Sequence, residues 1–301
     1  MKITTLTLNP AFDIHVSLKT FPLGRESLAD AVSRDIGGKG INISRALTEN
    51  GIENTALVVL GKENSAEFLR GMERAGLTYQ TLLWEGRIRE NITIHPESEP
   101  ETRLSFKGFE YNASLLKKAE ELIDPQGIVT FTGSVPAGIS AEEIEAFLLR
   151  LKEKGARLVI DSKSVSLEML KRIQPWLIKP NAEEVEAYYG KAPSEEELYA
   201  AAMELHQAGI ANAMISLGGS GAVLAAEGRL YRAQVPAIKA VSTVGAGDSA
   251  IAGFLSCDDA PEKRLRYAVA YGSAACLREG TNPPRAVDID KIFEKVSIKK
   301  L

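Results

Sequence analysis

The chain has 301 residues, of which 45% are hydrophobic and 25% are charged, and its formal net charge is -4. This composition is typical of one soluble α/β domain with a sizeable core, and the lack of a basic stripe argues against a nucleic-acid partner. No segment approaches the roughly 18 apolar residues of a membrane span, and the first residues lack a signal-peptide pattern. We therefore expect a cytoplasmic location and no membrane partner.

Three stretches alternate between apolar and polar residues with the period of a β-strand, at 12–18, 91–95 and 102–107. A small sheet of this kind is not stable alone, so its apolar face needs cover from the main domain or from a second copy of the chain. We expect a lid built from about residues 10–25 and 87–110, and a homodimer formed through it. The alternative is that these strands form an antiparallel edge of the main sheet.

A glycine-rich turn, Gly37-Gly38-Lys39-Gly40, precedes a predicted helix at 41–49. Glycines expose backbone N–H groups at a helix start, where an anion is favoured. Lys39 adds positive charge, and Asn42 offers both a donor and an acceptor. This chemistry suits a phosphorylated sugar. The alternative is a tight turn with a solvated lysine, and the pattern is not a Walker A loop, which requires Ser or Thr after the lysine.

From residue 127 onward, short apolar stretches alternate with amphipathic ones, which predicts βαβ units and a mostly parallel sheet covered on both faces. The expected strands are residues 127–132, 157–161, 176–179 and 213–217, and the expected helices are residues 141–154, 164–172, 182–189 and 195–208. No repeat, low-complexity run or Gly/Ser linker divides the chain. We expect residues 1–301 to form a single domain.

The segment from Lys179 to Glu184 follows one of these strands, at the edge where open α/β sheets bind ligands. Asn181 and Glu184 are three residues apart on a first helical turn, so both can hold Mg²⁺ directly or through water. The same spacing is that of a helix capping box. Residues 216–221 form another glycine-rich segment, which can pass close to nucleotide phosphates or simply form a hairpin loop.

Residues 242–249 read Ser-Thr-Val-Gly-Ala-Gly-Asp-Ser and lead into an apolar helix. The glycines leave bare N–H groups at the helix start, which favours an anion, yet Asp248 places a carboxylate in the same turn. This pairing fits a base that takes a proton from a nucleophile attacking a phosphoryl group. Such a base needs no raised pKa if it accepts the proton late in a loose transition state. The alternative is an acid that serves only the helix dipole.

Taken together, the GGKGIN and GAGD segments resemble the two signatures of the PfkB, or ribokinase-like, family of carbohydrate kinases, and the resemblance covers essentially the full chain. The opening Leu8-Asn9-Pro10-Ala11-Phe12-Asp13 is similar to the branch that contains 1-phosphofructokinase and tagatose-6-phosphate kinase. The resemblance implies a three-layer α/β/α fold with a mostly parallel central sheet and a small β-sheet lid. It also implies ATP and Mg²⁺ as cofactors and a ketohexose phosphate as substrate.

Carried onto this sequence, the resemblance implies that Asp248 is the general base and that the amides of Gly245, Ala246 and Gly247 stabilise the transferring phosphoryl group. The implied sugar-phosphate ligands are Asp13, Gly38, Lys39, Asn42, Arg89, Arg103 and Ser134, with Arg25 reaching the site of a second subunit. The implied nucleotide contacts are Lys179, Asn181, Ser216, Gly218, Gly221 and Thr243, with the metal held by Asn181 and Glu184. Arg87 or Lys107 can substitute for the lid arginines.

The sequence departs from the branch pattern in the lid strand at 101–111, which leaves the position of the substrate phosphate open. We expect phosphorylation of fructose 1-phosphate to fructose 1,6-bisphosphate, with tagatose 6-phosphate and fructose 6-phosphate as alternative acceptors. A catalytically idle sugar-phosphate sensor on the same scaffold is a hypothesis of a different class. A dinucleotide oxidoreductase is disfavoured because no GxGxxG motif follows the first strand.

Overall fold

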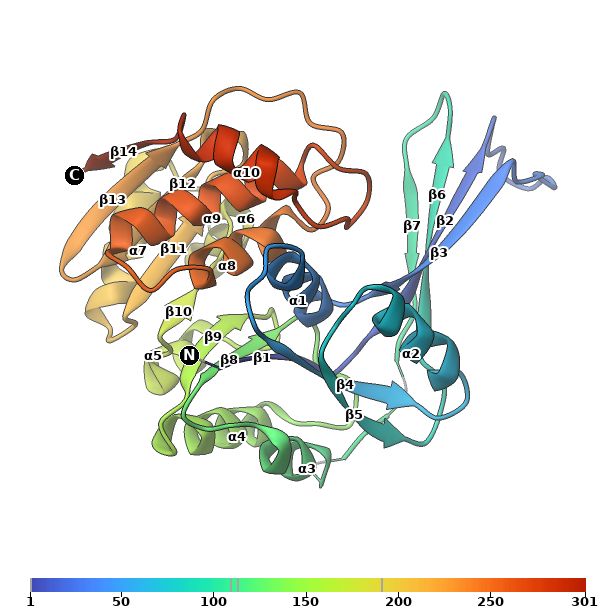
Figure 1. Ribbon diagram of the computed structural model, residues 1–301, viewed down its shortest axis with the longest axis horizontal. Helices are drawn as coiled ribbons and strands as arrows, with labels where there is room; N and C mark the ends of the chain where they lie inside the picture. Colours follow the sequence, from blue (N-terminus) through green and yellow to red (C-terminus); the bar gives the residue numbers. More distant parts are fainter. Residues whose placement is uncertain (1, 109, 113, 191) are drawn as a thin grey trace.

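The computed structural model describes residues 2–108, 110–112, 114–190 and 192–301, without the side chains of 187–189, and its strands form two separate sheets (Figure 1). Phe109, which falls within the expected lid, lies outside the described residues. The larger sheet contains ten strands: β1 (Ile3–Thr7), β4 (Thr55–Gly61), β5 (Tyr79–Trp84), β8 (Ile128–Thr132), β9 (Arg157–Asp161), β10 (Leu177–Ile178), β11 (Asn212–Ser216), β12 (Ala222–Ala226), β13 (Arg229–Gln234) and β14 (Ser297–Lys300).

The order of strands in this sheet is β14-β13-β12-β11-β10-β9-β8-β1-β4-β5. The strands from β5 to β11 pair in parallel, and β12, β13 and β14 extend the sheet as an antiparallel edge. The apolar strands β1 and β8 are buried along their whole length, as expected for strands covered on both faces. The prediction of a mostly parallel central sheet is confirmed.

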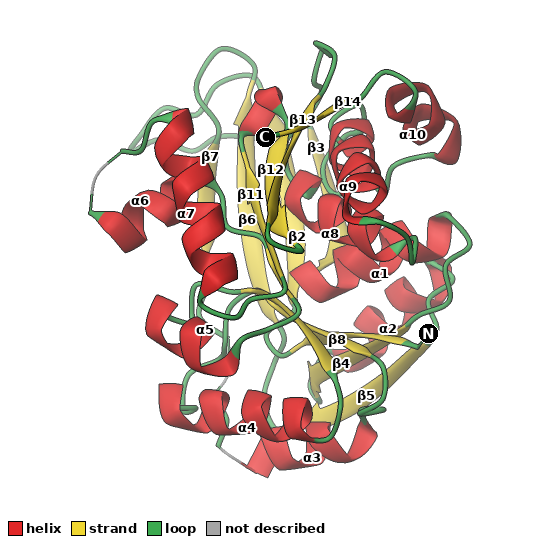
Figure 2. Cartoon of the chain, turned by 90° about the vertical axis from the view of Figure 1, so that its left-hand side faces the viewer, coloured by secondary structure: helices red, strands yellow, loops and turns green. Residues whose placement is uncertain are grey.

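Helices cover both faces of the large sheet (Figure 2). They are α1 (Lys39–Glu49), α2 (Ser65–Arg74), α3 (Ser114–Leu122), α4 (Ala141–Glu153), α5 (Leu167–Ile173), α6 (Ala182–Tyr189), α7 (Glu195–Gln207), α8 (Ala246–Leu255), α9 (Pro261–Ala275) and α10 (Ala286–Phe293). One hydrophobic core joins the sheet to α3 through α7. A second core joins its other face to α1, α8, α9 and α10, which gives the expected three-layer α/β/α arrangement.

The smaller sheet projects from the body beside α2 (Figure 1). Its strands, in order, are β3 (Ala31–Gly37), β2 (Ala11–Leu18), β6 (Arg89–Pro96) and β7 (Thr102–Ser105). The period-two stretches are therefore strands, and they form a separate sheet rather than an edge of the large one. The sequence did not reveal β3, because its residues are mostly exposed and show no clean alternation.

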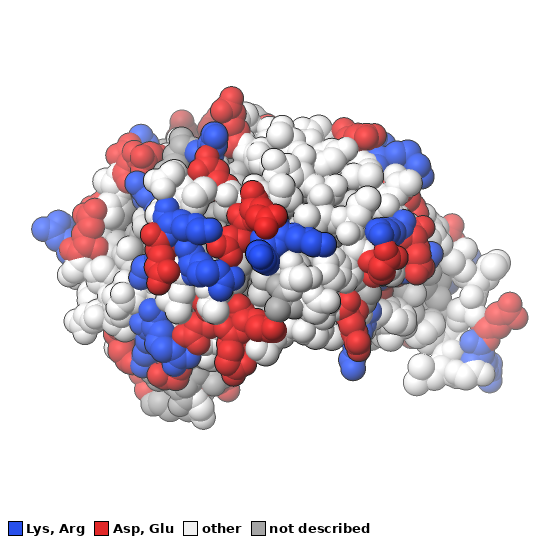
Figure 3. All heavy atoms as spheres, turned by 90° about the horizontal axis from the view of Figure 1, so that it is seen from below, with Lys and Arg blue, Asp and Glu red and all other residues white. Residues whose placement is uncertain are grey.

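Charged side chains of both signs are interspersed on the face of the molecule seen in Figure 3. One exposed ion pair joins two helices of the body, where Nη2 of Arg172 on α5 lies 2.9 Å from Oε2 of Glu145 on α4. Exposed pairs of this kind contribute about 0–1 kcal/mol to folding.

Within the described part of the chain, no helix combines the length and apolar character of a membrane span.

Candidate active site

A cleft of about 400 Å³ opens at the carboxyl ends of β1, β8, β9 and β10, beneath the small sheet. This edge is where open α/β sheets bind their ligands. The predicted site residues that line the cleft come from segments far apart in the sequence: Asp13, Gly38, Lys39, Asn42, Arg89, Arg103, Ser134, Lys179, Asn181, Glu184, Gly245, Gly247 and Asp248. The fold thus brings most of the predicted residues together.

Asp248 lies in the first turn of α8 and is 6% exposed. The turn that precedes it places Gly245 at φ 77°, a left-handed conformation that favours glycine. The side-chain amide of Asn42 donates a hydrogen bond of 2.8 Å to Oδ2 of Asp248. Burial raises the pKa of Asp248 to about 6, although the nearby Lys39 ammonium lowers it. A raised pKa was not required by the mechanism expected from the sequence, whereas burial in the fold brings the pKa of this carboxylate closer to neutral pH.

Asp161, at the end of β9, lies between two lysines in the cleft. Its Oδ2 is 2.9 Å from Nζ of Lys39 and 3.8 Å from Nζ of Lys179. Burial disfavours the charged form of Lys39, but the carboxylates of Asp161, Asp248 and Glu184 outweigh that effect and raise its pKa. The ammonium of Lys179 also packs against the α8 turn, since a Cβ on Gly247 would lie 3.1 Å from Nζ. The ammonium groups of both lysines therefore lie close to the Asp161 carboxylate.

Asn181 and Glu184 form a capping box at the start of α6. Oδ1 of Asn181 accepts from the Glu184 N–H at 2.8 Å, and Oε2 of Glu184 accepts from the Asn181 N–H at 3.0 Å. The structural alternative for this pair is thus confirmed. The box uses only one carboxylate oxygen of Glu184, and both side chains also line the cleft.

The cleft provides oxygen ligands suited to a hard cation, but no dedicated metal cage. Asp161, Asn181 and Glu184 line it with carboxylate and amide oxygens, which are the ligands that Mg²⁺ prefers. Across the described residues, no group of three His, Cys, Asp or Glu converges to hold a metal ion. Mg²⁺ is normally held by one or two carboxylates together with substrate phosphates and water, and these residues fit that mode.

The small sheet contributes a carboxylate and two arginines to the roof of the cleft. Oδ1 of Asp13 accepts a 2.9 Å hydrogen bond from Asn91, and Nη2 of Arg103 lies 3.7 Å from the same atom. Arg89 donates to the carbonyl oxygens of Asn9 and Phe106, each at 3.2 Å. Its buried Nε has no hydrogen-bond partner in the described part of the chain, and burial lowers its pKa. Such a guanidinium is suited to an anionic ligand.

Six predicted residues do not line the cleft: Arg25, Ser216, Gly218, Gly221, Thr243 and Ala246. Arg25 is exposed in the loop between β2 and β3. The N–H of Ala246 donates to the carbonyl oxygen of Thr243 at 3.3 Å. The glycine-rich segment forms the turn between the antiparallel strands β11 and β12, which is the hairpin alternative. The roles of these residues remain predictions.

Several lining residues were not predicted from the sequence: Thr7, Asn9, Ala11, Asn91, Thr132, Gly133, Asp161, Val244 and Thr281. One signal was available for Asp161, because it is an acidic residue at the carboxyl end of a predicted strand. For Asn91 and Thr281, no local motif marks the position.

Comparisons with known proteins agree with this architecture. The 1-phosphofructokinase of Haemophilus influenzae is 32% identical over 98% of this chain and 97% of its own length, and that of Escherichia coli K12 is 31% identical over 91% and 90%. The structure of phosphofructokinase-2 from Escherichia coli in complex with substrates and products superposes with a TM-score of 0.91 at 27% identity, covering 98% of this chain and 99% of that one. Residues 7–287 match the description pfkB family carbohydrate kinase, and the chain belongs to this family.

Proposed function

We propose that the protein transfers the γ-phosphoryl group of ATP to fructose 1-phosphate and forms fructose 1,6-bisphosphate. The observation that carries this proposal is the placement of a buried carboxylate, Asp248, in the same cleft as the cationic groups of Lys39 and Arg89. A base and anion-binding groups that line one cleft suit an acceptor that carries both a hydroxyl and a phosphate. The relatives named 1-phosphofructokinase support the same acceptor.

In this mechanism Asp248 accepts the proton of the attacking hydroxyl, and Asn42 holds the carboxylate in place through its side-chain amide. Lys179 exchanges part of its contact with the Asp161 carboxylate for phosphoryl oxygens when ATP binds. It stabilises the charge on the transferring group together with the amides of the α8 turn. Phosphoryl transfer of this kind depends mostly on positioning and charge.

ATP and Mg²⁺ are the proposed cofactors. Bound Mg²⁺ would neutralise charge on the ATP phosphates. Glu184 and Asp161 would hold the hydrated ion, with Asn181 keeping Glu184 at the start of α6 through the capping box.

We infer that residues 1–301 act as one kinase domain in which the small sheet serves as a lid that excludes water. The lid spans about residues 10–25 and 87–110, together with β3. Part of its apolar face is open, since Val32, Leu104 and Phe106 are 63%, 46% and 49% exposed. A second copy of the chain covering this face would give the homodimer, and Arg25 would then reach the second active site.

Fructose 6-phosphate is the second candidate acceptor, because the chain superposes on phosphofructokinase-2 over nearly its whole length. Coupled ADP release with Mg-ATP measures kcat/KM for fructose 1-phosphate, fructose 6-phosphate, tagatose 6-phosphate and fructose. We expect fructose 1-phosphate to exceed the other acceptors at least tenfold. A preference for either 6-phosphate overturns the proposed acceptor, and no turnover with any sugar favours the sensor.

A further inference from the structure

Arg89 occupies the first position of β6, where the lid joins the body. Successive side chains of a strand point to opposite faces, so Arg89 faces the cleft while Glu90 faces the back of the lid sheet. On the cleft side, the Arg89 guanidinium donates to two backbone carbonyl oxygens. Its direction therefore depends on how the strand around it is fixed from behind.

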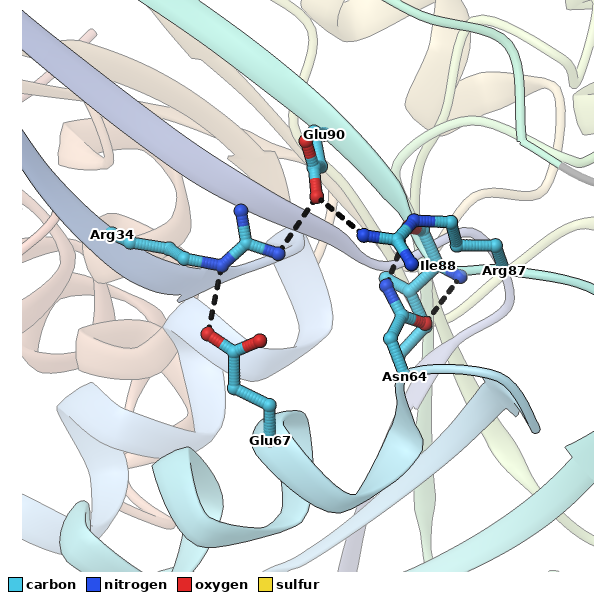
Figure 4. Close-up of polar contacts among 6 residues, drawn as sticks. All are labelled: Arg34, Asn64, Glu67, Arg87, Ile88 and Glu90. Atoms are coloured by element: carbon cyan, nitrogen blue, oxygen red, sulfur yellow. Dashed lines mark hydrogen bonds and ion pairs between the residues drawn. The ribbon is translucent and has the colours of Figure 1, made fainter.

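An ion-pair relay links α2 of the body to this strand (Figure 4). Nε of Arg34, on β3, lies 2.8 Å from Oε1 of Glu67 on α2, and Nη2 of Arg34 lies 2.8 Å from Oε1 of Glu90. The bond from Arg34 lowers the pKa of Glu90, so Glu90 stays charged at neutral pH. The Arg34 guanidinium also stacks 3.9 Å from the centre of the Phe12 ring on β2. One side chain thus ties three lid strands to the body.

A second contact fixes the residue on the other side of Arg89 (Figure 4). Oδ1 of Asn64 accepts from the Ile88 N–H at 2.8 Å, and Nδ2 of Asn64 donates to the Ile88 carbonyl oxygen at 3.1 Å. Asn64 occupies the N-cap position of α2, where an asparagine ordinarily accepts from the helix backbone, yet its side chain makes no cap bond. Its hydrogen-bonding groups are directed to the lid instead.

Close backbone packing leaves this junction little room to shift. A Cβ on Gly61 would lie 2.6 Å from the carbonyl oxygen of Gly86 and 2.7 Å from the nitrogen of Ile88. A Cβ on Gly71 of α2 would lie 2.4 Å from Cγ2 of Ile36 on β3. Both residues that flank Arg89 are therefore held by the body.

We propose that Arg34 and Asn64 are positioning residues that hold Arg89 toward the cleft from the back of the lid. This inference rests on the proposed function, in which Arg89 binds the phosphate of the sugar. Arg34 acts through Glu90, and Asn64 acts through Ile88. Loss of either contact lets the start of β6 move and misdirects the guanidinium, which weakens sugar-phosphate binding and leaves the chemical step largely intact.

Double-mutant cycles against Arg89 test the proposal. Steady-state kinetics are measured for Arg34→Gln, Asn64→Ala and Arg89→Ala, for the doubles Arg34→Gln/Arg89→Ala and Asn64→Ala/Arg89→Ala, and for the control Arg172→Gln, which removes an ion pair remote from the lid. We expect Arg34→Gln and Asn64→Ala each to raise KM for fructose 1-phosphate about tenfold. The expected changes in kcat and in KM for Mg-ATP are below about twofold, and the control should match the wild type.

In the Arg89→Ala background, Arg34→Gln and Asn64→Ala should each raise KM for fructose 1-phosphate by less than about twofold, because the guanidinium that they position is absent. The same fold-change in both backgrounds, or no effect in the single variants, overturns the proposal. If Arg34→Gln does not fold, the Asn64→Ala cycle decides. If the wild type does not phosphorylate fructose 1-phosphate, the proposed acceptor is wrong. The same double-mutant cycles, measured with the sugar phosphate that the enzyme does phosphorylate, then test the positioning role of Arg34 and Asn64.

Discussion

The α8 turn and the lid contribute opposite kinds of residue to the same cleft. Asp248 is 6% exposed, and its carboxylate accepts a hydrogen bond from Asn42. The Arg103 side chain, in contrast, is 49% exposed, and its guanidinium makes a long contact of 3.7 Å with the Asp13 carboxylate. The turn begins helix α8, which packs on one face of the large sheet, while the lid is a separate four-stranded sheet that projects from the body (Figure 1). Asp248 is therefore held by the body, whereas Arg89 and Arg103 enter the cleft from the lid, to which we assign the proposed binding of the acceptor phosphate.

The two lid arginines provide the largest test of this division. Replacing Arg89 by Ala removes a partly buried guanidinium, and we expect kcat/KM for fructose 1-phosphate to fall about 10- to 100-fold, mainly through KM. Arg103→Ala should cost less than about tenfold because that side chain is half exposed. Lys107→Ala is the matched control, since Lys107 is an exposed lid cation outside the cleft. An equal loss in all three variants would remove Arg89 from phosphate binding.

The capping box allows the metal role of Glu184 to be separated from its structural role. Glu184→Gln keeps a side-chain acceptor for the Asn181 N–H and removes the charge, so we expect the Mg²⁺ concentration at half-maximal rate to rise about tenfold. Glu183→Gln is the control, because Glu183 is exposed in the same turn. Titration of the rate with Mg²⁺ at fixed ATP measures the effect. Identical Mg²⁺ titration curves for the two variants would mean that Glu184 caps α6 and has no role in metal binding.

The pH dependence of kcat/KM tests the electrostatics of the turn. Protonated Asp248 cannot accept a proton, so the rate should fall as pH drops through about 6. Lys39 lowers the pKa of Asp248, and Lys39→Gln should therefore move this acid limb to higher pH. The substrate phosphate also titrates near pH 6, but its pKa is the same for every variant. A difference in the acid limb between Lys39→Gln and the wild type therefore reports on Asp248. Lys163→Gln, an exposed lysine of the neighbouring loop, should leave the limb in place.

The smallest expected effect is the change in the thermal stability of the protein on replacing Asp248 by Asn. The folded pKa of Asp248, about 6, is above its ordinary value of 3.8. The group therefore stabilises the fold fully below pH 3.8, and this contribution is lost as the pH rises through 6. Asp248→Asn removes the buried charge, so its Tm at pH 8 should exceed that of the wild type by a few degrees, and the gain should shrink toward pH 4. Thermal unfolding at both pH values measures it, and a lower Tm at pH 8 would contradict the assigned burial cost.

The features that could be predicted from the sequence are those encoded in short segments of the chain. The glycine backbone N–H groups and the carboxylate of Asp248 are adjacent in the chain, so one short segment predicted both. The spacing of Asn181 and Glu184 predicted either a metal-binding pair or a capping box, and the structure contains the capping box. The alternating strands β2 and β6 were also visible, because one face of each is apolar.

Features that depend on long-range packing were not predictable in this way. Strand β3 is defined by its pairing with β2 rather than by its own pattern. Asp161 enters the site because the strand order places the end of β9 between β8 and β10. The raised pKa of Asp248 follows from its burial in the folded structure. Each requires the tertiary structure.

The kcat of Asp248→Asn, measured with saturating Mg-ATP and fructose 1-phosphate beside the wild type, tests the central claim most directly. We expect a fall in kcat of roughly 10²- to 10⁴-fold, with KM for the sugar phosphate within about threefold, because Asp248 acts on the proton and the lid binds the phosphate. A kcat within threefold of the wild type would remove Asp248 from the mechanism.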